Sequence, residues 1–371
     1  MSDIDTAFMR RCFALAEQGR QTARPNPVVG CVIVAQGTVV GEGWHAVAGQ
    51  PHAEVHALRQ AGAQARGATA YVSLEPCVHQ GRTGPCCDAL IAAGISQVVY
   101  GQEDPNPLVA GKGLARLRAA GVSVSGPLLP DEAEALNPGF CKRMRGGLPW
   151  VRCKVAMSLD ARTAMASGES QWITGAAARE DVQYWRARSC AVLSGSGTVL
   201  ADDPALTVRL ADFAGHQPLR VICDSTLCTP PGARLLQQPG AVLLVCAHAD
   251  EGKLAALRAA AAATVQLDSL PVPSADGKVD LLALLQHLAR QRQCNEVLVE
   301  AGATLGGALL QAGLIDELLL YVAPMLLGSE ACPLFDLRGL LQLSDAWQLE
   351  FSDVAMVGKD CRMRTRVVKG E

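Results

Sequence analysis

Residues 51–77 carry the clearest structural pattern in the first half of the chain. They begin Pro-His-Ala-Glu at 51–54 and end Thr-Ala-Tyr-Val-Ser-Leu-Glu-Pro-Cys at 69–77. The first part opens a helical pattern over residues 52–63, and the second is an apolar strand that ends at Leu74. A helix followed by a buried strand is the repeating unit of a layered α/β sheet. Polar side chains at the ends of such elements are therefore the first candidates for a site.

Helical and strand patterns alternate on both sides of this stretch. Apolar residues recur at helical spacing over residues 8–16, and an apolar strand pattern begins at Val28. Further patterns follow in order: a strand ending near Trp44, a helix over 86–93, strands over 97–101 and 121–126, and a helix over 131–145. The regular alternation predicts a layered α/β domain.

A domain boundary is expected at Gly146-Gly147-Leu148-Pro149, where the helical pattern stops at a glycine pair and a proline. Alternation then resumes, with strands expected over 151–160, 190–195, 219–224, 241–246 and 296–300, helices over 176–188, 252–263 and 279–292, and one more helix and three strand candidates after them. The sequence thus predicts two α/β domains, residues 1–147 and 148–371.

Composition and net charge exclude several classes of protein. The 371 residues are 49% hydrophobic and 19% charged, which excludes a disordered chain. The net charge of −3 gives no overall basic field for nucleic acid or membranes. Met1 opens a polar segment without a signal-like apolar region, so we expect a cytoplasmic protein whose 14 cysteines stay reduced. Most of them, such as Cys31, Cys190, Cys223 and Cys246, are then core residues, and a few could bind metal.

Three residues have the pattern of a zinc site with one open position. His52 begins a helix, Cys77 follows a strand, and Cys86 begins the next predicted helix. Zinc binds imidazole and thiolate, and three protein ligands leave a fourth position for water, as in catalytic sites. Glu54 lies in the same helical turn as His52 and can move a proton without being a ligand.

Other interpretations of these residues stay open. Cys87 could complete a structural zinc site, although adjacent cysteines rarely bind one tetrahedral ion. His45, His56 and His79 could be ordinary helix-end or surface histidines. Asn26, between two prolines, has the donors and the acceptor to recognise a pyrimidine edge, or it simply forms a turn.

The pattern His52-Ala-Glu54 with Pro76-Cys77 and Pro85-Cys86 matches the known signature of zinc nucleobase deaminases, except that eight residues separate the cysteines. With this longer loop, Pro25-Asn-Pro-Val-Val-Gly30 and Asp104-Pro-Asn-Pro107, the sequence resembles the bifunctional deaminase/reductase family of riboflavin biosynthesis over nearly its whole length. It departs from the family at Gly84-Pro85, where two prolines are usual. The resemblance implies a cytidine-deaminase-like three-layer domain and a dihydrofolate-reductase-like domain.

The second half contains a glycine-rich turn, Val299 to Gly307, between a strand and a helix. Such a turn suits a phosphate, although close packing also explains it. The resemblance implies that it binds NADPH. The cofactor contacts implied in this way are Ala156, Trp172, Thr198, Asp202, Ser225, Gly302, Ala303, Thr304, Leu305, Gly306, Gly307 and Ala308.

The expected substrates are small phosphoribosylaminopyrimidines. In the first domain the expected contacts are Asn26 and His45, and the resemblance adds the loop residues His79 and Arg82. In the second domain the resemblance implies Ser170, Arg186, Leu206, Arg209 and Glu300. Arg209 has the fork geometry to bind a phosphate. The implied reactions are hydrolytic deamination of 2,5-diamino-6-(5-phosphoribosylamino)pyrimidin-4-one to 5-amino-6-(5-phosphoribosylamino)uracil, with Zn²⁺, and then reduction of its ribosyl chain by NADPH, in a homo-oligomer.

Two other classes compete with this hypothesis. A tRNA-type nucleic-acid deaminase fused to an unrelated domain shares the His-Ala-Glu and Pro-Cys pattern, but it needs a basic surface that the charge balance does not favour. A zinc-stabilised scaffold without catalysis needs no carboxylate beside an open metal position, so Glu54 argues against it.

Overall fold

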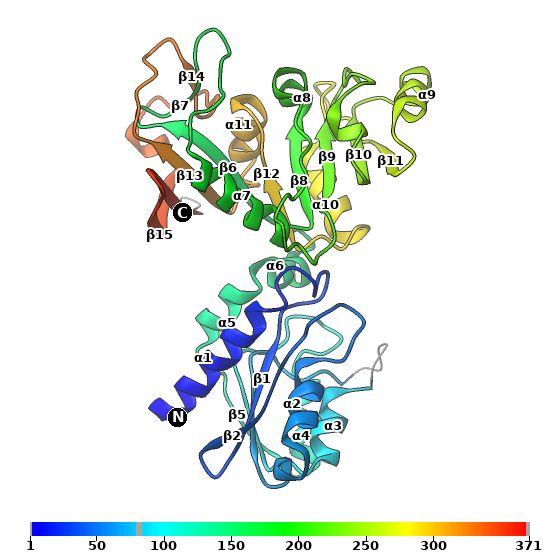
Figure 1. Ribbon diagram of the computed structural model, residues 1–371, viewed down its shortest axis with the longest axis vertical. Coiled ribbons are helices and arrows are strands. Elements are labelled where there is room, and N and C mark those ends of the chain that lie inside the picture. Colours follow the sequence, from blue (N-terminus) through cyan, green and yellow to red (C-terminus); the bar gives the residue numbers. More distant parts are fainter. Residues whose placement is uncertain (1, 79–83, 369–371) are drawn as a thin grey trace. The chain divides into compact units, whose positions relative to one another are not determined.

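The computed structural model describes residues 2–78 and 84–368 and divides the chain into two compact units, residues 1–147 and 148–371 (Figure 1). Unit 1 has a five-stranded sheet in the order β2-β1-β3-β4-β5. Strands β1 (Gly30–Ala35), β2 (Thr38–Trp44) and β3 (Thr69–Val72) pair in antiparallel fashion, whereas β4 (Gln97–Tyr100) and β5 (Ser123–Ser125) continue from β3 in parallel.

Helices cover both faces of this sheet because alternate residues of each strand point to opposite sides. Cys31 and Ile33 of β1 pack with α2 (Ala53–Ala61), α3 (Cys86–Ala92) and α4 (Lys112–Ala119). Val32 and Val34 pack on the other face with α1 (Asp3–Glu17) and α5 (Pro130–Leu136). Helix α6 (Pro138–Gly146) ends the unit. Because helices lie on both faces of the sheet, unit 1 is a three-layer α/β sandwich.

Glycine allows strand β2 to lie directly against the first turn of α2. A Cβ atom at Gly43 would stand 2.4 Å from the carbonyl oxygen of Ala53, closer than any real contact. Any larger residue would displace the start of α2, where His52 and Glu54 lie. The close approach therefore fixes the position of the predicted metal site.

Unit 2 is built on a nine-stranded sheet in the order β11-β10-β9-β8-β12-β6-β13-β16-β15. Its strands are β6 (Trp150–Ser158), β8 (Ala191–Gly195), β9 (Leu219–Cys223), β10 (Gly240–Cys246), β11 (Val265–Pro271), β12 (Glu296–Val299), β13 (Glu317–Ala323), β15 (Gln348–Val357) and β16 (Asp360–Val368). The pairs from β11 to β13 are parallel, and β16 and β15 are antiparallel additions. A small sheet joins β7 (Arg162–Ala164) to β14 (Cys332–Pro333).

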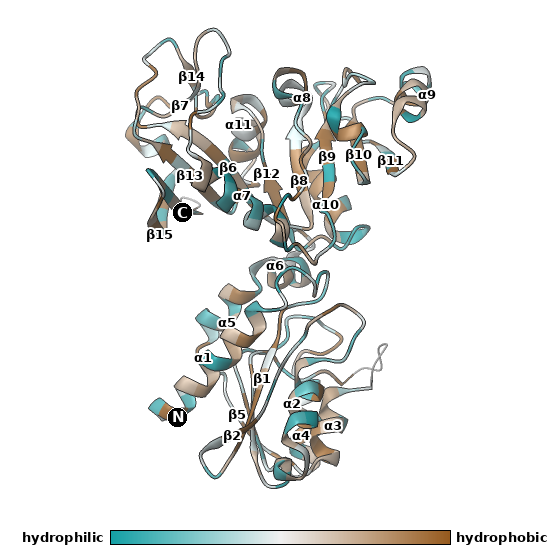
Figure 2. Ribbon diagram, in the orientation of Figure 1, coloured by the Kyte–Doolittle hydropathy of each residue, from teal (hydrophilic) through white to brown (hydrophobic). Residues whose placement is uncertain are grey.

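Helices also cover both faces of the parallel part, as parallel sheets require. Helices α10 (Leu281–Arg290) and α11 (Ala303–Gln311) pack on one core cluster, and α7 (Ala176–Arg188), α8 (Ser196–Asp202) and α9 (Glu251–Ala260) contribute to two others. In Figure 2 the central strands of this sheet are mostly hydrophobic, as expected for strands buried on both faces.

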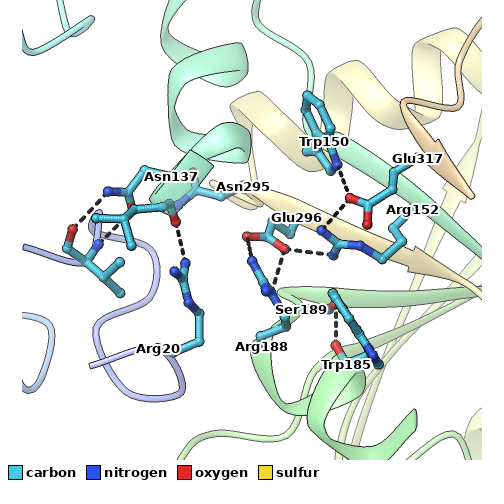
Figure 3. Close-up of polar contacts among 12 residues, drawn as sticks. Arg20, Asn137, Trp150, Arg152, Trp185, Arg188, Ser189, Asn295, Glu296 and Glu317 are labelled. Atoms are coloured by element: carbon cyan, nitrogen blue, oxygen red, sulfur yellow. Dashed lines mark hydrogen bonds and ion pairs between the residues drawn. The ribbon is translucent and has the colours of Figure 1, made fainter. Parts of the chain in front are cut away.

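A buried ion network joins the amino ends of three neighbouring strands in unit 2 (Figure 3). The Arg152 guanidinium donates to Glu296 and Glu317, each at 2.9 Å, and it lies 4.6 Å from the ring centre of Trp185. Because each carboxylate has a charged partner, the network ties β6 to β12 and β13. Because the network lies at the amino ends, the carboxyl ends of the same strands remain available for a ligand-binding site.

The predicted α/β class is confirmed, with local differences. Residues 131–145 form two helices instead of one, because Pro138 cannot donate to the preceding turn and the chain restarts as α6 there. Helices α4 and α8 and strand β11 were not expected. None of the 14 cysteines, all of which the structure describes, forms a disulfide, and Cys190 and Cys223 are only partly buried instead of lying fully in the core. Within residues 2–78 and 84–368, none of the helices combines the length and apolar character needed to cross a bilayer.

Candidate active sites

The three predicted metal ligands come together in unit 1. Nδ1 of His52 lies 3.2 Å from Sγ of Cys86 and 3.6 Å from Sγ of Cys77, and all three ligand atoms lie within 4.8 Å of one another. Tetrahedral zinc with bonds of roughly 2.1 and 2.3 Å to nitrogen and sulfur separates these atoms by about 3.6 Å. Hydrogen bonds from Cys86 hold the pKa of the Cys77 thiol well below its ordinary value, which favours the thiolate that binds metal. This donor set fits zinc.

Glu54 lies beside these ligands with an unused oxygen. Its side chain is only 3% exposed, and Oε2 is buried without a hydrogen-bond partner in the described part of the chain. Burial raises the pKa of this carboxyl above its ordinary value. A buried acid with a free oxygen beside an open metal site can accept a proton and pass it on.

A cavity of about 170 Å³ opens onto the ligands and is lined by Asn26, His45, Glu54, Asp104 and Phe140, among others. His45 Nδ1 lies 3.3 Å from the Pro51 carbonyl, which can only accept, so Nδ1 carries the proton. Burial lowers the pKa of His45, which keeps the ring neutral. Its Nε2 therefore accepts from Nδ2 of Asn26 at 3.0 Å.

Two acidic residues, Glu75 and Asp104, were not predicted to belong to this site, although Asp104 stands in the Asp104-Pro-Asn-Pro107 segment on which the family resemblance rests. The Glu75 carboxylate is buried and accepts from the backbone N–H groups of Asp104, Gly111, Gly113 and Leu114. It thereby holds the loop that brings Asp104 to the cavity. Burial raises the pKa of Asp104 to about 6. The Glu75-Pro-Cys motif was the available signal, but the loop that Glu75 binds is distant in sequence.

Other sequence candidates near the metal site have different positions. Cys87 is buried away from the three ligands, and its thiol donates to the carbonyls of Pro76 and Gly113. It is a core residue and not a fourth ligand. His56 lies on α2 but outside the ligand group. His79 and Arg82 lie outside the described residues.

In unit 2 the predicted residues gather at the carboxyl ends of parallel strands. Ala156 lies near the end of β6, Thr198 in the helix after β8, Ser225 just after β9 and Glu300 just after β12. The crevice at this edge is where open α/β sheets bind ligands. Topology thus unites residues that are up to 144 positions apart in the chain.

Glu300 is the centre of a buried charge cluster at this edge. Arg186 donates to both its oxygens, at 2.5 and 3.0 Å, and Nζ of Lys154 lies 3.6 Å away. Burial alone would raise the pKa of Glu300, but the charges of Arg186 and Lys154 outweigh it and lower the pKa to about 2. Arg186 also donates to the carbonyl of Thr207, between Leu206 and Arg209. Lys154 was missed, although a lysine inside an apolar strand was a signal.

A second group lies beside the α8 helix. The Ser170 hydroxyl donates to Asp202 at 3.3 Å, which brings a predicted substrate residue to a predicted cofactor residue. Trp172 is 67% exposed, and the Arg179 guanidinium lies 4.4 Å from its ring centre. An exposed aromatic held by a cation is a surface on which a planar ligand group can stack.

The glycines of the glycine-rich turn fall into two groups, one facing open space and one closely packed. Gly302 is the N-cap of α11, has no side-chain cap, and has open space where a Cβ would stand. The first N–H groups of α11 can therefore meet a pyrophosphate, and the turn fits a dinucleotide. Gly306 and Gly307 instead pack closely, because a Cβ would stand 2.9 Å from the Phe335 ring and 2.5 Å from the Asp336 carbonyl oxygen.

Sequence comparisons agree with this division of the chain. Residues 2–102 match the family profile "Cytidine and deoxycytidylate deaminase zinc-binding region", and residues 149–362 match "RibD C-terminal domain". The riboflavin biosynthesis protein RibD of Escherichia coli is 53% identical over 367 residues, covering 96% of this chain and 97% of that protein. RibD of Haemophilus influenzae is 48% identical and covers 98% and 97%.

Solved structures also resemble the chain over nearly its whole length. RibD of Acinetobacter baumannii superposes with a TM-score of 0.90 at 46% identity, covering 99% of each chain. The diaminohydroxyphosphoribosylaminopyrimidine deaminase/5-amino-6-(5-phosphoribosylamino)uracil reductase of Thermotoga maritima has a TM-score of 0.86 at 30% identity, again over 99% of each chain.

Proposed function

The chain belongs to the RibD family of riboflavin biosynthesis proteins, and from this premise we propose that residues 1–147 are its zinc-dependent pyrimidine deaminase domain and residues 148–371 its NADPH-dependent reductase domain. The resemblance expected from the motifs is confirmed, and so is the fold class. The chain is a bifunctional enzyme. The tRNA-type alternative is not favoured, because the second half matches the RibD C-terminal domain and not an unrelated one.

The proposed substrate of the first reaction is 2,5-diamino-6-(5-phosphoribosylamino)pyrimidin-4-one. Water adds to the ring carbon that bears the amino group, the C–N bond breaks, and ammonia leaves to give 5-amino-6-(5-phosphoribosylamino)uracil. In the second reaction a hydride and a proton reduce the ribosyl chain to ribityl. The observation that carries the proposal is the cavity lined by His52, Cys77, Asn26 and Glu54, whose Oε2 has no hydrogen-bond partner among the residues that the structure describes.

Each residue of the first site has a proposed task. Zinc bound to His52, Cys77 and Cys86 would supply a Lewis acid that activates water near neutral pH. Oε2 of Glu54 takes the proton from the attacking water and gives it to the departing nitrogen. Among the described residues the Asn26 amide bonds only to His45, so its oxygen and its second N–H can pair with the pyrimidine edge.

The second site orients a phosphorylated sugar chain. NADPH would supply the hydride, with its pyrophosphate at Gly302 and Ala303 and its other contacts at Ala156, Trp172, Thr198, Asp202 and Ser225. Glu300 holds Arg186 and faces Lys154, and these two cations with Arg209 can receive the substrate's phosphate and hydroxyl groups. Ser170 and Leu206 complete the proposed substrate contacts.

Two broader properties belong to the same proposal. The chain is proposed to act as a homo-oligomer, a dimer or a tetramer, which light scattering on the purified protein tests. It is also proposed to work in the cytoplasm, where its free thiols stay reduced.

A substrate comparison tests the proposed function. Purified protein with about one zinc per chain should release ammonia from the phosphoribosylated diaminopyrimidine and not from RNA. Release from RNA alone would support a nucleic-acid deaminase instead. Zinc-containing protein that releases ammonia from neither would reject the deaminase assignment.

A further inference from the structure

Asn137 joins helix α6 to the loop that carries Asn26. Its Oδ1 accepts from the backbone N–H of Val28 and its Nδ2 donates to the backbone carbonyl of Val28, both at 2.8 Å (Figure 3). The side chain is only 6% exposed, so these bonds do not compete with solvent. The Asn137 side chain thus pairs with both the backbone N–H and the backbone carbonyl of Val28, as a residue of a neighbouring strand would.

A further hydrogen bond lies next to these two and joins Arg20, in the segment between α1 and the Asn26 loop, to Leu136, the last residue of α5. Nη1 of Arg20 donates to the carbonyl of Leu136 at 2.6 Å, immediately before Asn137 (Figure 3). The first turn of α6 supplies Phe140, which lines the cavity and packs in a cluster with Leu74. The start of α6 therefore supports the Asn26 loop and forms part of the cavity wall.

The Asn26 loop needs such support because it has no regular secondary structure of its own. Asn26 lies two residues before Val28 and four before β1 begins at Gly30. The Asn26 side chain must keep its hydrogen bond to His45 and present its remaining amide groups to the cavity. A displacement of about 1 Å at such a contact is enough to weaken catalysis on the order of 10²-fold.

We propose that Asn137 is a positioning residue for deamination, which fixes the Val28 backbone so that Asn26 stands ready to bind the pyrimidine edge. This inference rests on the proposed deaminase function. Asn137 itself is not expected to touch the substrate. Its role is to keep the loop in its binding conformation before the substrate arrives, so that binding does not have to order the loop.

Two variants of Asn137 test the inference. Asn137→Ala removes both bonds, and Asn137→Asp keeps an acceptor for the Val28 N–H but loses the donor to the Val28 carbonyl. We expect KM for the diaminopyrimidine to rise about ten-fold in Asn137→Ala and at least as much in Asn137→Asp, where a carboxylate oxygen would face the buried Val28 carbonyl oxygen, with zinc content unchanged. The reductase activity of the same chain, assayed on deaminated substrate, should stay at its wild-type value.

A core variant provides the matched control. Val122 is 7% exposed and belongs to the core cluster on the α2 face of the sheet, so Val122→Ala should lower stability without moving the Asn26 loop. Partial unfolding reduces the amount of active enzyme and hence the apparent kcat, whereas KM stays constant. A raised KM in the Asn137 variants with an unchanged KM in Val122→Ala supports positioning.

A double-mutant cycle identifies the residue through which Asn137 acts. If Asn137 works through Asn26, then Asn137→Ala should raise KM far less in an Asn26→Ala background than in the wild type. Equal effects in both backgrounds, or an unchanged KM in both Asn137 variants, would overturn the inference. Absence of ammonia release by wild-type protein is a different outcome, because it rejects the deaminase function itself.

Discussion

Arg186 and Glu300 form a bidentate, buried ion pair, with donor–acceptor distances of 2.5 and 3.0 Å, between helix α7 and the residue that follows β12. The sequence indicated both as substrate contacts but could not show that they contact each other. The pair gives the reductase domain a rigid charged wall. It also makes each residue costly to remove, because the other charge stays buried.

Glu300→Gln should therefore lower both the free energy of unfolding and the kcat/KM of the reduction. Leaving Arg186 buried without its counter-charge costs about 3–5 kcal/mol in the free energy of unfolding, measured by urea denaturation. Reductase kcat/KM should fall on the order of 10²-fold, while ammonia release stays unchanged. The exposed pair Arg258–Glu251 provides the control, and Glu251→Gln should cost less than about 1 kcal/mol. Equal losses in the two variants would contradict this assignment.

The same ion pair predicts that the free energy of unfolding decreases at acid pH. The pKa of Glu300 is lowered from 4.5 to about 2, so its stabilising contribution is complete above pH 4.5 and is lost as the pH falls toward 2. The difference in unfolding free energy between wild type and Glu300→Gln should shrink across this range, by about 1.4 kcal/mol for each pH unit at most. A difference that is independent of pH would show that Glu300 is not held ionised by its partners.

Glu54→Gln isolates the proton transfer of the first reaction. Deamination should fall about 10²- to 10⁴-fold, because Gln cannot accept and return the proton. Zinc content and reductase activity should be retained, since Glu54 is not in the ligand group. Glu132→Gln, which removes a surface partner of Arg10, is the control and should deaminate normally. Near-wild-type deamination by Glu54→Gln would refute its role.

The adjacent cysteines allow a sharp test of the metal site. Cys86→Ser should reduce zinc from about one ion per chain to nearly none, as measured by atomic emission. Cys87→Ser should keep the ion, because this side chain only donates to the carbonyls of Pro76 and Gly113. Loss of zinc in Cys87→Ser with retention in Cys86→Ser would assign the ligand to the other residue.

The glycine-rich turn predicts opposite effects at two positions. Gly307→Ala should destabilise the chain by about 1–3 kcal/mol, because its Cβ would stand 2.5 Å from the Asp336 carbonyl oxygen. Gly302→Ala has open space and should leave stability unchanged, but it should raise KM for NADPH if the pyrophosphate lies there. An unchanged KM for NADPH in Gly302→Ala would remove this turn from the cofactor site.

Sequence patterns predicted the parts of this protein that depend on local order. The spacing of His52 and Glu54 in one helical turn, and the cysteines at element ends, led to a ligand group that the fold brings together. Pro138 was also a visible signal for the break between α5 and α6. Strand β11 was missed because it is an edge strand without a clean apolar alternation.

What could not be predicted depends on contacts between distant segments. Asn137 and Val28 are separated by 109 positions, and Lys154 and Glu300 by 146. The sequence can draw attention to one of these residues, such as a lysine inside an apolar strand, but it does not show which residue it contacts. Packing likewise distinguishes Gly306 from Gly302, because only the folded chain places Phe335 against one of them. These tertiary contacts supply the positioning that the motifs alone do not reveal.

The most direct test of the two-reaction assignment is one time course on purified, zinc-containing protein supplied with the diaminopyrimidine and NADPH, in which ammonia and the absorbance of NADPH are followed together. We predict that ammonia appears first and that NADPH oxidation follows after a lag, which vanishes when deaminated substrate is supplied. NADPH oxidation that precedes ammonia, or ammonia with no NADPH oxidation at all, would contradict the assignment.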